Sequence, residues 1–255
     1  MPLDVITVPC LSDNYAFVIG NAHTGEAAVV DVPEAGPINA VLSDKGWTLT
    51  TVLLTHHHWD HVDGLGDLTG ADTATIIGAS ADTHRLPALT TAVADRDTFN
   101  LLGETVQVFD VSGHTVGHIA FYIPSIAHVF TADSLMALGC GRLFEGTPAQ
   151  MWDSLSKLRA LPDNTTVCSG HEYTQANAAF ALTIDPDNKR LTSRAADITT
   201  ARNAGQPTVP SSLLLEKQTN PFLRADDPAI RAHLGMQNAD DAEVFAEIRK
   251  RKDNF

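Results

Sequence analysis

Residues 55–61 read Thr55-His56-His57-His58-Trp59-Asp60-His61, and this short segment holds four of the chain's eleven histidines. His56 directly follows residues 51–55, an apolar segment whose composition predicts a strand. Side chains alternate along an extended chain, so His56 and His58 point the same way from the strand end. If the backbone then turns into a helix, Asp60 and His61 face the same space. Such nitrogen and oxygen donors predict two adjacent ions of zinc, iron or manganese.

Further candidate ligands follow the ends of three later predicted strands. His114 comes after the strand at 104–111, Asp133 after the strand at 129–131, and His171 after the strand at 165–168. Ligands collected at strand ends of an α/β architecture form an active-site crevice. His118 and the isolated histidines elsewhere are better explained by packing. The pattern therefore predicts a metal site built by His56, His58, Asp60, His61, His114, Asp133 and His171.

The composition limits the classes of function that the chain can have. A length of 255 residues suits one large domain or two modest ones, and 44% hydrophobic residues are enough for a full core. The formal net charge of −14 repels phosphate backbones and argues against general nucleic-acid binding. No apolar run approaches the roughly 18 residues of a membrane span, and no secretory signal is visible. Three widely spaced cysteines favour a reducing, cytoplasmic location.

Strand patterns fill the first two-thirds of the chain and disappear after about residue 173. Helical patterns then cover residues 176–182, 188–203, 228–234 and 240–252. We therefore expect a layered α/β domain over residues 1–173 and a helical domain over residues 174–255. The helical part closes with the basic run Arg249-Lys250-Arg251-Lys252, which is unusual in so acidic a chain.

Several motifs together point to one protein family. Residues 55–61 resemble the H-x-H-x-D-H signature of the metallo-β-lactamase superfamily. The other motifs are Gly113-His114-Thr115 with Gly117-His118, Gly139-Cys140-Gly141-Arg142-Leu143-Phe144-Glu145-Gly146, Gly170-His171-Glu172-Tyr173-Thr174, Thr219-Asn220-Pro221-Phe222-Leu223-Arg224 and Arg249-Lys250-Arg251-Lys252-Asp253. In order along nearly the whole chain, these motifs resemble those of the hydroxyacylglutathione hydrolase family, also called glyoxalase II. This resemblance implies a four-layer αββα sandwich followed by a helical domain that helps to hold glutathione.

The resemblance also implies how the ligands are shared between two divalent ions, zinc first, with iron or manganese as alternatives. His56, His58 and His114 would bind one ion, and Asp60, His61 and His171 the other. Asp133 would bridge the two ions and hold the attacking hydroxide, together with Asp60 and His61. Asp31, at the end of an early strand, resembles a carboxylate that orients a metal-bound histidine.

Glutathione would be gripped, by motif position, by Arg142, Phe144, Tyr173, Arg249 and Lys252. Phe144 departs from the family, because some members have tyrosine there and a phenyl ring donates no hydrogen bond. Glutathione conjugates carry two carboxylates, so a chain with a charge of −14 must supply cations locally. Arg142, Arg249 and Lys252 would be those cations.

The implied reaction is hydrolysis of an S-(2-hydroxyacyl)glutathione, first of all S-D-lactoylglutathione to D-lactate and glutathione in methylglyoxal detoxification. A pair of metal ions about 3.5–4 Å apart lowers the pKa of a shared water. The leaving thiolate, whose conjugate acid has a pKa of about 8.5, departs without a strong general acid. The only partner expected is this small thioester, without nucleic acid or membrane, bound by a monomer or weak homo-oligomer.

Two other interpretations stay open on the sequence alone. A mono-iron persulfide dioxygenase of the same superfamily would need only three ligands, and it would leave Asp60 and His61 unexplained. A metal-binding module without catalysis would have no use for seven ligand candidates, because structural sites close around one ion.

Overall fold

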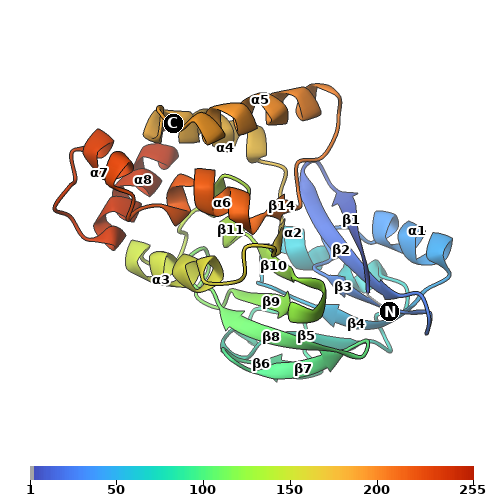
Figure 1. The fold of residues 1–255 in the computed structure, drawn as a ribbon. Helices are drawn as coiled ribbons and strands as arrows, with labels where there is room; N and C mark the ends of the chain where they lie inside the picture. Colours follow the sequence, from blue (N-terminus) through green and yellow to red (C-terminus); the bar gives the residue numbers. More distant parts are fainter. Residues whose placement is uncertain (1–2) are drawn as a thin grey trace. The chain divides into compact units, whose positions relative to one another are not determined.

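The computed structural model describes residues 3–255, which form two compact units (Figure 1). The first unit contains the chain up to Asp110 together with Val116–Ala132. The second unit contains Val111–Thr115 and Asp133–Phe255. Among residues 3–255, no helix combines the length and the apolar character that a bilayer-spanning segment requires.

The first unit contains a six-stranded mixed sheet. Its first three strands, β1 (Asp4–Cys10), β2 (Asn14–Asn21) and β3 (Glu26–Val30), pair antiparallel. From β3 onward the strands run parallel, through β4 (Thr48–Leu53), β5 (Thr75–Ala79) and β6 (Thr91–Val93). Helix α1 (Ala35–Lys45) connects β3 to β4 and ends at Gly46, whose φ of 64° suits glycine.

Parallel strands place the start of the histidine stretch at one edge of this sheet. Because β3 and β4 run in the same direction, Asp31 after β3 lies beside the segment after β4. The Asp31 amide donates to the Leu53 carbonyl at 2.9 Å. The short helix α2 (Trp59–Val62) follows, and then the 3₁₀ turns η1 (Asp63–Asp67) and, after β5, η2 (Ser80–Asp82).

An antiparallel meander completes the first unit, with a 3₁₀ turn, η3 (Pro124–Ile126), between its last two strands. Phe130 of this meander meets Phe17 of β2 edge to face, with ring centroids 5.5 Å apart. Both side chains are buried, so the apolar core of the unit lies between the first sheet and the meander. The strands are β7 (Thr98–Leu101), β8 (Glu104–Asp110), β9 (Ile119–Ile123) and β10 (His128–Ala132).

The second unit is mostly helical. Its strands are short: β11 (Leu135–Met136) pairs with β12 (Gly139–Cys140), and β13 (Thr166–Ser169) with β14 (Ser211–Ser212). Stacked and edge-on contacts join the buried rings of Phe180, Phe222 and Phe245. The helices are α3 (Pro148–Arg159), α4 (Thr174–Ile184), α5 (Lys189–Asn203), α6 (Leu213–Thr219), η4 (Pro221–Leu223), α7 (Pro228–Leu234) and α8 (Asp241–Asp253).

The elements follow the sequence expectation, apart from several short ones. The short strands β6, β7, β11, β12 and β14 and the helix α6 were not expected, and β14 lies beyond residue 173, where the strand pattern ends. The second compact unit includes residues 133–173, because α3 packs on α8 and η4 and so belongs with the C-terminal helices. The domain boundary expected at residues 173 and 174 stays a prediction.

Candidate metal centre

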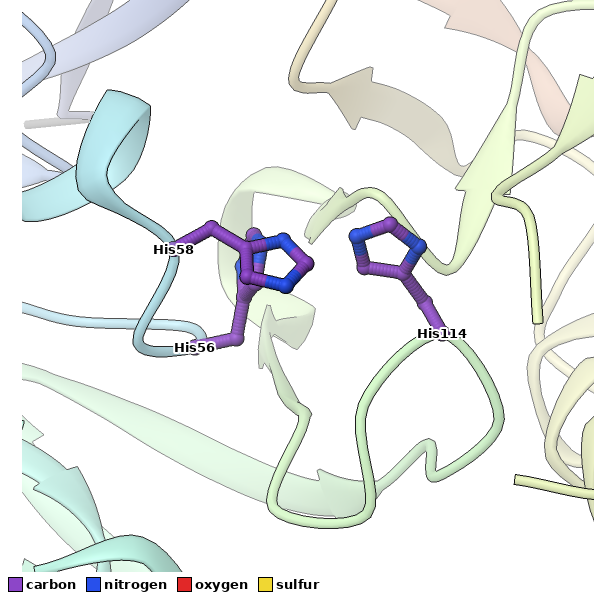
Figure 2. Close-up of side chains that lie close together, drawn as sticks. All are labelled: His56, His58 and His114. Carbon is purple, nitrogen blue, oxygen red and sulfur yellow. The ribbon is translucent and has the colours of Figure 1, made fainter. Parts of the chain in front are cut away.

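The first unit holds four of the candidate ligands on one short segment. His56 follows the end of β4, His58 precedes α2, and Asp60 and His61 lie on that helix. Figure 2 shows the His56 and His58 side chains on this segment, and His114 on a loop of its own. Nε2 of His56 lies 3.1 Å from Nδ1 of His58, and the His56 and His61 rings are fully buried, with centroids 4.2 Å apart.

The carboxylate of Asp31 fixes the orientation of this segment. Its Oδ1 accepts from the Thr55 amide at 2.9 Å, and its Oδ2 lies 2.8 Å from both the Thr55 hydroxyl and Nδ1 of His61. The Thr55 hydroxyl also lies 3.0 Å from Nδ1 of His56. One ligand atom from each of Asp31, His56 and His61 lies within 4.8 Å of the others. Asp31 is therefore the common support of two candidate metal ligands.

These hydrogen bonds decide which nitrogen of each ring carries its proton. A carboxylate only accepts, so the Thr55 hydroxyl gives its hydrogen to Asp31 and must accept from Nδ1–H of His56. By the same reasoning His61 donates from Nδ1 to Asp31. In the neutral rings of both residues, Nε2 then offers a lone pair, which is the form that binds a metal ion.

Side chains next to the candidate ligands make contacts that hold the segment in place. Nδ1 of His57 lies 2.9 Å from the buried carboxylate of Asp82, which also accepts from Nε of Arg85 at 2.5 Å. The His118 ring, expected to pack, is buried and stacks on His56 at a centroid distance of 4.5 Å. Sequence reasoning missed Asp82, because nothing in its local pattern distinguishes it from an exposed acidic residue.

In the second unit, two candidate histidine ligands converge on one carboxylate oxygen of a third candidate, Asp133. Oδ2 of Asp133 lies 3.4 Å from Nε2 of His114 and 3.3 Å from Nε2 of His171. All three side chains are buried. Nδ1 of His114 lies 2.8 Å from the Arg142 carbonyl, which only accepts, so the proton of a neutral His114 sits on Nδ1.

The position of this proton indicates whether a cation would fit between His114 and Asp133. The lone pair on Nε2 of His114 faces a carboxylate oxygen, and two acceptors at this distance repel each other. A positive charge between them, either a metal ion or a second proton on the ring, removes the repulsion. Imidazole and carboxylate donors of this kind suit a divalent transition metal, so the residues fit the ion that the sequence predicts.

Two exposed aromatic rings cover the histidines of the second unit. The Phe144 ring meets His114 edge to face at 5.3 Å, and the Tyr173 ring stacks on His171 at 4.7 Å. Both residues are exposed, at 61% and 41% of the residue surface. Each therefore places an aromatic ring beside a candidate ligand.

The expected glutathione-binding cations also lie in the second unit. Arg249 is buried, lies over the Phe222 ring at 5.1 Å, and donates from Nη1 to the Cys140 carbonyl at 3.0 Å. Nζ of Lys252 lies 5.2 Å from the centre of the Phe180 ring. Burial and the charge of Arg249 hold the pKa of Lys252 below that of an ordinary lysine. Arg142, by contrast, has 59% of its side chain exposed.

Cys140 lies among these groups without the properties of a nucleophile. Its side chain is buried, and this burial raises the pKa of the thiol to about 11 despite the neighbouring Arg249. The thiol therefore stays protonated at neutral pH, and only the thiolate attacks efficiently.

Comparison with known proteins places both parts of the chain. Residues 11–171 match the metallo-beta-lactamase superfamily, and residues 172–255 match the family described as hydroxyacylglutathione hydrolase C-terminus. A protein of Ruegeria pomeroyi called hydroxyacylglutathione hydrolase is 66% identical, and one of Roseobacter denitrificans with the same name is 63% identical. Both alignments cover 100% of this chain and of the relative.

Solved structures show the same fold at much lower sequence identity. The BLEG-1 B3 metallo-beta-lactamase superposes with a TM-score of 0.67 at 19% identity, covering 86% of this chain and 99% of that one. The α/β fold with a C-terminal helical region that the motifs implied is thereby confirmed.

Proposed function

Because the chain belongs to the hydroxyacylglutathione hydrolase family of the metallo-beta-lactamase superfamily, we propose that it hydrolyses the thioester of an S-(2-hydroxyacyl)glutathione. The first substrate to test is S-D-lactoylglutathione, whose products are D-lactate and glutathione. The observation that carries the proposal is a pair of buried carboxylates. Asp31 accepts from Nδ1 of His61 and so leaves the Nε2 lone pair of that ring available, and Oδ2 of Asp133 lies near Nε2 of both His114 and His171.

We assign the ligands to two divalent ions. His56, His58 and His114, the side chains of Figure 2, would hold one ion, and Asp60, His61 and His171 the other, with Asp133 as the bridge. Support comes from the donor chemistry, since imidazole and carboxylate groups suit zinc first and also iron or manganese. When bound, such a pair of ions lowers the pKa of a water and polarises a carbonyl.

The protein's own part is to hold these donors and the substrate in place. Asp31 and Thr55 keep the Nε2 lone pairs of His56 and His61 available, and the Arg142 carbonyl does the same for His114. The thiolate of glutathione is a good leaving group, because its conjugate acid has a pKa of about 8.5. No acidic side chain has to protonate it, so Asp60 and Asp133 serve as ligands alone.

Positively charged side chains and aromatic rings would recognise the glutathione part of the substrate. Its two carboxylates meet Arg142, Arg249 and Lys252, which offset locally the repulsion from a chain of net charge −14. Phe144 and Tyr173 would contact the apolar parts of the substrate, with Phe144 acting through its ring face alone. Cytoplasmic location and a monomer or weak homo-oligomer, without nucleic acid or membrane, complete the proposal.

The deciding experiment measures thiol release from S-D-lactoylglutathione and counts the metal ions in the same sample. We expect steady turnover with about two ions per chain, loss of turnover after treatment with a chelator, and recovery on adding zinc. Asp133→Ala should lose both metal and activity. Asp153→Ala on α3, where 72% of the side chain is exposed, is the matched control and should keep both.

The competing functions give different results in the same assay. A protein with two bound ions and no turnover would refute the proposed hydrolase and leave a metal-binding module. One iron per chain, with oxygen uptake when glutathione persulfide is added, would identify a persulfide dioxygenase.

A further inference from the structure

A carboxylate of the chain itself occupies the cation cluster at the end of α8. Oδ1 of Asp253 accepts from Nε of Arg249 at 3.1 Å and from Nη2 of Arg249 at 2.8 Å. The same oxygen lies 3.5 Å from Nε of Arg142. One carboxylate oxygen thus contacts two of the three cations that the proposed function assigns to glutathione.

The geometry at Arg249 leaves little room for a second carboxylate. The Nε and Nη2 edge of a guanidinium is a fork that pairs with a carboxylate, and at Arg249 this edge already binds Asp253. Nη1 donates to the Cys140 carbonyl, which fixes the plane of the group. A ligand carboxylate that approaches the same edge therefore competes with Asp253 for the same hydrogens.

The two partners differ in how easily they can move. The Arg249 side chain is 8% exposed and is held by the Cys140 carbonyl and the Phe222 ring. The Asp253 side chain is 36% exposed and belongs to the last residue of α8, where helix hydrogen bonding ends. Arg249 is thus the fixed partner, and Asp253 is the one that can swing into solvent.

We propose that Asp253 holds the place of a substrate carboxylate in the free protein and is displaced when the glutathione part of the substrate binds. This inference rests on the proposed function. Without Asp253, the buried charge of Arg249 would have no anionic partner in the free protein, which is costly. Asp253 therefore keeps Arg249 ordered before binding, and it lowers the affinity for glutathione because it must first be removed.

Asp253→Asn tests the displacement, because it removes the charge and keeps the size of the side chain. We expect the KM for the glutathione thioester to fall by about three- to fivefold, the change expected for an ion pair whose carboxylate is partly exposed to water, while kcat stays within about twofold. The dissociation constant of S-methylglutathione, measured by calorimetry, should fall by the same factor. Asp253→Glu, which keeps the charge, should retain the KM of the natural protein.

Glu247→Gln is the matched control. Glu247 lies on the same helix and accepts from Nε of Arg251 at 2.8 Å, four residues along, as Asp253 does from Arg249. Its carboxylate pairs with Arg251, which the proposed function does not assign to glutathione, so this variant should leave KM unchanged. S-methylglutathione with both carboxylates esterified is a second control, whose affinity should not respond to Asp253→Asn.

The outcomes separate this inference from the proposed function. A natural protein that binds S-methylglutathione and turns over the thioester, but whose KM rises or does not change in Asp253→Asn, would overturn the displacement alone. An equal gain in Glu247→Gln, or with the esterified ligand, would overturn it as well, because the effect would then be general electrostatics. A natural protein that neither binds nor hydrolyses glutathione compounds would refute the proposed function instead.

Discussion

Asp31 lies at a backbone position that most residues avoid. Its φ is +57°, in the left-handed region, which aspartate tolerates better than most side chains. The unusual backbone turns the carboxylate toward Thr55 and His61, and both interactions are 2.8 Å long. The strain thus accompanies a defined task, which is to hold two imidazole rings in the tautomer that binds metal.

We expect Asp31→Asn to weaken metal binding without removing any ligand. The amide of asparagine would donate toward Nδ1 of His61, and this nitrogen would then have to accept. The ring proton would move to Nε2, the nitrogen needed for the metal, so zinc affinity should fall by about 10- to 100-fold. A competition titration with a chromophoric chelator measures this change. Asp44→Asn, on the exposed face of α1, is the control, and equal zinc affinities in the two variants would contradict the role of Asp31.

The sequence alone indicated some of the candidate site residues, but not others. The spacing in residues 55–61 indicated the candidate ligands of the first unit directly, because alternation and a helix turn fix their directions. Asp31, Arg142 and Tyr173 became candidates only through the family resemblance, since their local patterns are ordinary. Asp82 was not predicted at all, because its partner His57 is brought to it by the packing of distant segments.

At the scale of elements, prediction succeeded where local chemistry marks both ends. Helix α7 was expected at residues 228–234 and has these bounds, with Asp227 as its N-cap and Gly235 in the left-handed conformation at its end. Helix α6 was missed, because it begins without a side-chain cap in a proline-rich segment. Strand β14 was missed because two residues carry no periodic pattern, and only its pairing with β13 defines it.

The β11–β12 hairpin shows what the Thr219-to-Arg224 motif does in the fold. Nδ2 of Asn220 donates to the carbonyls of Met136 and Gly139, at 3.1 and 3.0 Å. Buried Glu216 accepts from the amide of Leu138, whose φ is +55° at the hairpin turn. The hairpin begins two residues after Asp133 and ends two residues before Arg142. Asn220 and Glu216 therefore hold the segment between Asp133, a proposed metal ligand, and Arg142, a proposed substrate cation.

Asn220→Ala should destabilise the protein by about 2 kcal/mol, because two buried carbonyls lose their donor. Equilibrium unfolding in urea, followed by circular dichroism with metal present, measures the loss in the free energy of unfolding. Asn39→Ala serves as the comparison, since its amide donates to the Asp67 carbonyl near the surface and water can replace it. A loss at Asn220 no larger than at Asn39 would mean that the hairpin is held by other contacts.

For the molecule as a whole, the sequence predicted the fold class, whereas the packing of α3 could not be predicted. The confirmed α/β fold with C-terminal helices follows from motifs in order along the chain. An early proline and the spacing of apolar residues predict the helix α3 itself. The compact units depend on which helices α3 packs against, and local patterns do not contain that information.

The net charge of the chain and its local cations would have opposite effects on substrate binding. Under the proposed function, the net charge of −14 repels an anionic glutathione thioester, whereas Arg142, Arg249 and Lys252 attract its carboxylates at close range. Salt screens interactions over about 10 Å at 0.1 M and about 3 Å at 1 M. At 0.1 M the charges spread over the chain are therefore already screened, and the short-range attraction is what further salt weakens.

We accordingly expect the KM for the glutathione thioester to rise steadily between about 0.1 and 0.5 M sodium chloride, with little change in kcat. Steady-state kinetics in buffers of equal pH measure this slope. In Arg142→Gln the slope should be shallower, because one exposed cation no longer contributes and 59% of that side chain is open to ions. A KM that falls with added salt would reverse the argument, since the field of the whole acidic molecule would then outweigh the local cations at the binding surface.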